Sequence, residues 1–212
     1  MRFAFLVLFA GLIAGCAPSS SAGPQPGDPT TEQRYAAVAL SCEYAECPVG
    51  VVKPAGDVRV EVVGSITGPQ QAALASTIEQ WNTACGNHTL STSGSAEAKM
   101  EFFFVPESRI SEVMPIYVEG NVGLFTFDWD ASNIITGMKV AIASDLSGDE
   151  LVHFVLEETT QAMGLVSDVE DPRSIFDAGT GRVTTYSSLD REVIELHCSS
   201  AVKQGMQASD IS

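Results

Sequence analysis

The segment from Ser147 to Gly164 constrains the fold of this chain most, because it predicts a helix that is apolar on most sides. Ser147-Gly-Asp-Glu resembles a capping box, and Gly164 suits a helix C-terminus, so we expect the helix to span 147–163. Apolar side chains cover much of its surface: Leu151, Val152, Val155, Leu156 and Met163. Such a helix must lie deep in a domain, covered by other elements.

One line of polar side chains interrupts this apolar surface. His153, Glu157 and Gln161 are spaced i, i+4 and i+8, so they lie one above the other on a helix, and Glu158 adjoins them. Burying a carboxylate without a partner is costly, so both glutamates must reach a donor, a charge, a metal or solvent. The line is therefore a candidate functional site on physical grounds alone.

The rest of the chain alternates strand patterns with helix patterns. Strands are expected at 57–64, 89–92, 99–106, 121–129 and 133–144, and helices at 31–46, 67–85, 147–163 and 188–198. A hairpin turn at 130–133 joins two of the strands, and 168–185 is loop-like. This order predicts an α+β fold.

The first residues predict export. The run 3–15 is apolar and uncharged but shorter than the roughly 20 residues that span a membrane, so it is typical of a signal peptide. It ends at Ile13-Ala-Gly-Cys16, which resembles the bacterial lipobox. We expect signal peptide 1–15, lipid on Cys16, a flexible tether at 16–30 and one globular domain at 31–212. Because no Asp follows Cys16, we expect the outer membrane, facing the periplasm.

Charge limits the partners. The chain has a net charge of −16, which should repel nucleic acid and anionic lipid headgroups. We therefore expect no nucleic-acid partner. Membrane attachment must come from the lipid on Cys16.

Four cysteines remain after the lipobox. An even number in an exported chain indicates two disulfides, with three pairings available. We expect Cys42–Cys47, which are near in sequence, and Cys85–Cys198, which would join the first core helix to the last. A zinc cluster is the rival interpretation, which the lack of a Cys-x-x-Cys pair disfavours.

The central segment also resembles known families. Glu157-Glu158-x-x-Gln161-x-x-Gly164-x-x-Ser167 overlays the zinc-peptidase pattern His-Glu-x-x-His-x-x-Gly-x-x-His/Asp of the metzincin-like proteins. With Ser174-Ile-Phe, Leu189-Asp and Gly205-Met, it is similar to uncharacterised proteobacterial lipoproteins that carry domain of unknown function 2927. The resemblance implies a zincin-like fold. That fold is a mixed, mostly antiparallel-edged twisted sheet with a core helix on one face, the motif helix and a C-terminal helix at 188–198.

The departures from that pattern imply loss of catalysis. A catalytic zinc takes three protein ligands, mostly imidazoles, whereas the three ligand positions here hold Glu157, Gln161 and Ser167. Glu158 stands at the general-base position and would be catalytic only in an active enzyme. No Met lies between Gly164 and Gln204, so the methionine turn of metzincins is absent.

We therefore expect no metal or cofactor, and a polar network that extends from His153 to Ser167. The expected function is that of a catalytically degenerate envelope lipoprotein that binds a protein, or a peptide added to the edge of the sheet. The alternative is a metal-dependent, peptidase-like hydrolase that uses zinc or another divalent metal on His153 and Glu157, helped by His88, His197 or Asp168. A purely structural lipoprotein is the third hypothesis.

Overall fold

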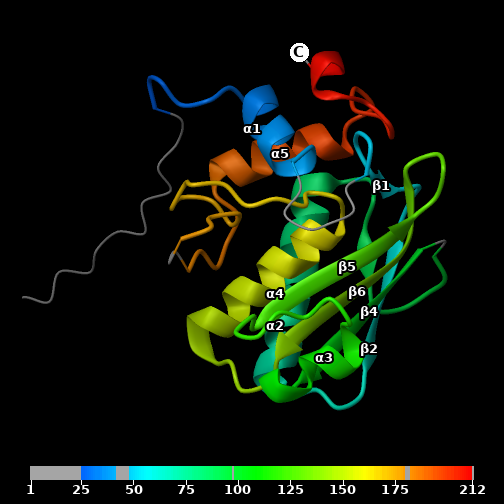
Figure 1. Ribbon diagram of the computed structural model, residues 1–212, viewed down its shortest axis with the longest axis vertical. Helices are drawn as coiled ribbons and strands as arrows, with labels where there is room; N and C mark the ends of the chain where they lie inside the picture. Colours follow the sequence, from blue (N-terminus) through cyan, green and yellow to red (C-terminus); the bar gives the residue numbers. More distant parts are fainter. Residues whose placement is uncertain (1–24, 42–47, 97, 180–181, 212) are drawn as a thin grey trace, which may run out of the picture.

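A computed structural model of the chain describes residues 25–41, 48–96, 98–179 and 182–211 (Figure 1). The predicted signal peptide, the lipobox with Cys16, and the predicted pair Cys42–Cys47 lie outside the described residues. Within the described part of the chain, no helix has both the length and the apolar character needed to cross a membrane.

Six strands form one sheet. They are β1 (Lys53–Pro54), β2 (Val58–Val63), β3 (Leu90–Ser91), β4 (Ala98–Val105), β5 (Gly123–Trp129) and β6 (Ile134–Ala143). The order is β1-β6-β4-β2-β3, with β5 paired to β6. Strand β2 aligns Val60 with Met100 of β4, and β4 aligns Phe102 with Val140 of β6.

The sheet shows that the expected fold class is wrong. We expected a zincin-like sheet with mostly antiparallel edges, but every pairing from β1 to β3 is parallel, and the one antiparallel pair among the described strands is β5 with β6. Parallel neighbours need crossover connections, and helix α2 (Gly68–Cys85) supplies one between β2 and β3. The molecule is a mixed α/β fold on a curled, largely parallel sheet.

The predicted hairpin is confirmed, and it explains where the antiparallel pair comes from. A short turn joins β5 to β6, with Asn133 at φ 60° and the Asp130 carboxylate accepting hydrogen bonds from the backbone N–H groups of Ser132 and Ile134. Local turn chemistry sets this pair, whereas the other pairings join strands far apart in sequence.

The remaining helices are α1 (Thr31–Ala39), α3 (Ile110–Val113), α4 (Gly148–Ala162) and α5 (Ser188–Cys198), with short 3₁₀ turns at Glu107–Arg109 and Ala208–Asp210. Of these helices, α4 and α3 pack on the sheet, whereas α1 and α5 lie together beyond its end (Figure 1). Helix α4 packs against α2 and against β5 and β6, while α1 packs on α5. Helix α1 ends at Ala39, earlier than the expected boundary at 46.

Two apolar clusters occupy the two faces of the sheet. The larger contains Trp81, Phe102, Val155 and Leu156, and so joins the sheet to α2 and α4. The smaller lies under α3 and includes Ile110, Met114 and Leu124. Strand β4 alternates between them, because Phe102 and Phe104 belong to the larger cluster and Phe103 packs against the smaller one.

The deep burial expected for the 147–163 helix is confirmed, but the capping box predicted at its start does not form. Every residue of α4 from Val155 to Ala162 is buried. Ser147 is the N-cap, but its side chain makes no capping hydrogen bond. After the helix, Gly164 has φ +107°, and a Cβ there would lie 2.1 Å from the Val52 carbonyl oxygen, so the position requires glycine.

The predicted Cys85–Cys198 disulfide is confirmed. It joins the last residue of α2 to the last residue of α5 and closes a loop with a sequence separation of 113 residues. Helix α2 packs against α4, so the bond also ties α5 to the layer of helices that carries the polar line.

Candidate functional site

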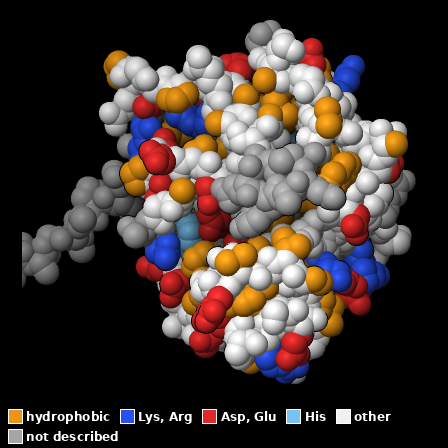
Figure 2. Space-filling view, viewed as in Figure 1, with side chains coloured by type: hydrophobic (Ala, Val, Ile, Leu, Met, Phe, Trp, Pro, Cys, Tyr) orange, Lys and Arg blue, Asp and Glu red, His pale blue; other side chains and the backbone are white. Residues whose placement is uncertain are grey.

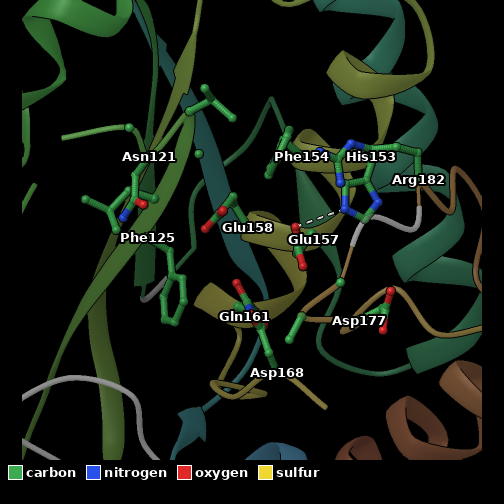
Figure 3. A pocket seen from close by; sticks show the side chains of 16 residues that line it. Asn121, Phe125, His153, Phe154, Glu157, Glu158, Gln161, Asp168, Asp177 and Arg182 are labelled. Carbon is green, nitrogen blue, oxygen red and sulfur yellow. Dashed lines mark hydrogen bonds and ion pairs between the residues drawn. The ribbon is translucent and has the colours of Figure 1, made fainter. Parts of the chain in front are cut away.

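The polar line of α4 opens into a cavity of about 260 Å³ between α4 and β5 (Figure 3). Helix α4 supplies one wall with His153, Phe154, Glu157, Glu158 and Gln161. The opposite wall is 120–125, at the start of β5, and the floor comes from Asp168, Asp177–Gly179 and Arg182. On the face seen in Figure 2, acidic side chains gather beside a histidine.

His153 and Glu157 form a buried pair. The Nε2 atom of His153 lies 3.2 Å from Oε2 of Glu157, and Nδ1 lies 2.9 Å from the Val183 carbonyl oxygen. The His153 and Glu157 residues are 1% and 6% exposed. The expected contact one helical turn apart is therefore present, and it fixes the imidazole from both sides.

The surroundings of His153 favour its protonated form. Burial by itself lowers the pKa of His153, but the hydrogen bond to Glu157, the negative charge of that carboxylate and the Val183 carbonyl together raise it. The net direction is a pKa above the ordinary value, despite a small opposing effect of the nearby Arg182 charge. A protonated His153 donates hydrogen bonds to the Glu157 carboxylate and the Val183 carbonyl, which hold the imidazolium in a fixed position beside the carboxylate.

Glu158 points from α4 towards β5, where Gly123 makes room for it (Figure 3). A Cβ at Gly123 would lie 2.6 Å from Oε1 of Glu158 and 3.0 Å from a ring carbon of Phe154. Any larger residue at 123 would therefore push the carboxylate out of place. The glycine lets helix and strand approach closely on either side of a buried charge.

The far end of the line is held by the loop after α4. The Gln161 amide donates to Oδ1 of Asp168 at 2.7 Å. Ser167, expected in the same network, does not line the cavity: its backbone N–H donates to the Val38 carbonyl, and its buried hydroxyl has no hydrogen-bond partner among the described residues. The structure thus brings together all the predicted site residues except Ser167.

The other two histidines lie away from the cavity. His197 contacts the Tyr35 hydroxyl at 2.9 Å and the Met163 carbonyl at 3.1 Å. Burial, aided by the charge of Lys53, lowers the pKa of His197 to about 3, so it is neutral. His88 also is not among the residues that line the cavity.

No group of three or more His, Cys, Asp or Glu side chains in the described residues is arranged to hold a metal ion. Glu157 is engaged by His153, and Gln161 by Asp168. The arrangement lines a partly enclosed space with four carboxylates and the Gln161 amide.

Buried hydrogen bonds hold the loop that forms the cavity floor. Asp190, which is fully buried, accepts from the Ser174 hydroxyl at 2.6 Å, from the Ile175 N–H and from the Ser187 N–H and hydroxyl. Burial raises the pKa of Asp190, and these hydrogen bonds oppose that rise. At the surface, Arg173 bonds both Asp171 and Asp28.

Among the described strands, β5 lies at an edge of the sheet beside the cavity. It pairs with β6 on one side, and no described strand pairs with its other side. The Ala143 N–H bonds the Val122 carbonyl, and antiparallel bonding alternates, so the backbone groups of 124 and 126 also face β6. Those of Gly123, Phe125 and Phe127 consequently face outwards.

The sequence predicted five of the 16 residues that line the cavity and missed the other 11. Gly123, Phe125 and Phe154 belong to patterns that indicate core or strand, and Asp177 and Arg182 lie in a loop without periodicity. The one available signal was Gly123 itself, since a glycine within a strand pattern often marks a close approach of two chains.

A family model described as "Protein of unknown function (DUF2927)" matches residues 28–212. No curated protein matches the chain.

Proposed function

We propose that this chain, which belongs to the DUF2927 family, binds a ligand at the cavity beside α4. The description of the family names no activity, so the proposal rests on the geometry of the site. The proposed ligand is a segment of an envelope protein or a peptide, held in extended form along β5 and over the cavity beside α4. The observation that carries this proposal is the outward-facing edge of β5 at the cavity wall.

A ligand segment in extended conformation can add a strand to the sheet along β5. Unpaired backbone groups at a strand edge bind a further strand through main-chain hydrogen bonds, and side-chain pockets add specificity. The outward groups of Gly123, Phe125 and Phe127 supply such an edge. Because alternate side chains of a strand point to the same face, every second ligand side chain would lie on the cavity side.

The same site supports binding better than hydrolysis. Hydrolysis by a metal enzyme needs a metal with an open position for water. At two of the positions that correspond to zinc ligands in the metzincin-like pattern, Gln161 is bonded to Asp168, and the Ser167 side chain is not part of the cavity lining. The hydrolase built on His153 and Glu157 stays an alternative that metal analysis tests.

We place this domain at the bacterial envelope. The proposal rests on the lipobox at Cys16, whose lipid would hold the chain at the outer membrane facing the periplasm. The proposed partner is then another protein or peptide of the envelope.

The test uses one pair of variants at Phe127, of which only one lacks the outward N–H group. Phe127→Ala and Phe127→Pro both remove the ring, but only proline removes the outward N–H, and proline is tolerated at an open strand edge. The probe is the peptide acetyl-Val-Thr-Lys-Thr-Val-amide, titrated into the full chain in mild detergent with ¹⁵N-labelled Phe and Gly. We expect the Phe125 amide signal to shift in the wild type and in Phe127→Ala, with at least fivefold weaker binding in Phe127→Pro. Equal binding by the two variants would refute strand addition.

A further inference from the structure

We propose that the cavity selects a ligand side chain that is cationic, a lysine or an arginine, and that the next ligand side chain on the same face is apolar. This inference rests on the proposed binding of an extended segment along β5. It adds which class of peptide binds.

The charge of the cavity favours a cationic ligand side chain. Among the described residues, four carboxylates line the cavity, from Glu157, Glu158, Asp168 and Asp177, against one guanidinium and one imidazole. Three of these acidic residues are at most 8% exposed: Glu157, Glu158 and Asp177. Salt screens buried charges less than exposed ones, so these carboxylates favour a cation over an anion.

The apolar surface beside the carboxylates also suits the side chains of lysine and arginine. Phe154 and Phe125 stand beside the carboxylates, so the cavity offers apolar surface next to charge (Figure 3). Lysine and arginine side chains match this, because their long apolar stems pack on apolar groups while the charged end reaches beyond. The chain itself places a guanidinium at this wall: the Cζ of Arg182 lies 5.1 Å from the centre of the Phe154 ring.

The aromatic side chains of β5 favour an apolar ligand side chain next to the cation on the same face. Phe125, Phe127 and Trp129 form a row on the cavity face, with ring centres 6.1 Å and then 5.7 Å apart. Alternate residues of an extended ligand are separated by about 6.5–7 Å. A ligand strand with its cation in the cavity would therefore place its next side chain on that face against the row, where an apolar residue fits best.

The test compares three peptides that differ only at the central residue: acetyl-Val-Thr-Xaa-Thr-Val-amide with lysine, norleucine or glutamate. Norleucine keeps the apolar stem of lysine without its charge. We measure the Phe125 amide shift of the full chain at low salt. We expect lysine to bind about tenfold more tightly than norleucine, as a charged hydrogen bond gives, and glutamate to bind most weakly.

Two matched variants test whether the preference for lysine comes from the carboxylates of the cavity. Glu158→Gln should reduce the preference for lysine over norleucine at least threefold, whereas Glu195→Gln, an exposed position on α5, should leave it unchanged. If Glu158→Gln does not fold, Asp177→Asn replaces it. Equal binding of the three peptides at Phe125 would overturn the cation preference and leave the binding function standing. If no peptide shifts the Phe125 signal, both proposals fail.

Discussion

Breaking the His153–Glu157 pair should destabilise the protein, and more so at acid pH. The perturbation is Glu157→Gln, which keeps the size of the side chain and removes its charge. The interaction that this substitution weakens joins two buried side chains, with Nε2 of His153 lying 3.2 Å from Oε2 of Glu157. We expect the melting temperature to fall while the fold is kept.

The size of the effect follows from the burial. A hydrogen bond to a charged group contributes about 1.5–3 kcal/mol to the free energy of unfolding. In a chain of this length 1 kcal/mol corresponds to about 2–4 °C, so the melting temperature should fall by roughly 3–12 °C.

The sign of the pH dependence follows from His153. Its pKa is raised in the folded state above the ordinary value, near 6.5, so the contribution of the charged pair is complete below that value. It is lost as the pH rises through the folded pKa. The assay is thermal unfolding at pH 5.5 and 8.5 of the wild type, Glu157→Gln, His153→Gln and the double variant. We expect a coupling free energy of at least about 1 kcal/mol at pH 5.5 and a smaller one at pH 8.5. Coupling that is near zero at both pH values, or larger at pH 8.5, would refute this reasoning.

Three further predictions concern the anchor, the disulfide and the metal. Cys16→Ala should abolish acyl labelling and release the chain from the membrane fraction; unchanged labelling would contradict the lipobox. Replacing Cys85 and Cys198 together by serine should lower the free energy of unfolding by roughly 4–5 kcal/mol in the chain-entropy model, because the closed loop is long, and chemical denaturation measures it. A chelator should leave the melting curve unchanged, and elemental analysis should find no stoichiometric zinc; a drop that added zinc reverses would favour the hydrolase.

Local patterns in the sequence predicted two of the helices to within one residue at each end. The last helix was expected at 188–198 and lies at Ser188–Cys198, and the α4 boundaries differ by one residue at each end. Both reflect features within a few residues: apolar spacing in each helix, the Ser187 cap of α5 and Gly164 after α4. The same local reasoning found the β5–β6 hairpin.

Pairing between distant strands was not predictable in this way. The alternation of Val58, Val60 and Val62 indicates a strand with one buried face, but it carries no information about the direction of the neighbouring strand. β1 was missed altogether, since it has two residues and one is Pro54. The predicted fold class was wrong because it rested on the order of strands and helices and on a resemblance centred on one helix, and neither sets the direction in which distant strands pair.

The site residues on α4 could be predicted from the sequence, whereas those that face α4 from β5 could not. Helical spacing is enough to place His153, Glu157 and Gln161 in one line. The other wall, however, depends on where β5 lies relative to α4, which is a result of tertiary packing. For the same reason Ser167, only six residues after Gln161, does not line the cavity once the chain has left the helix.

The most direct test of binding along β5 is amide hydrogen exchange, residue by residue, with and without acetyl-Val-Thr-Lys-Thr-Val-amide at saturating concentration. Strand addition predicts slower exchange of Gly123, Phe125 and Phe127, whose N–H groups face outwards, and unchanged exchange of Leu124 and Thr126, which face β6. Protection that is absent, or equal at all five residues, would contradict the account.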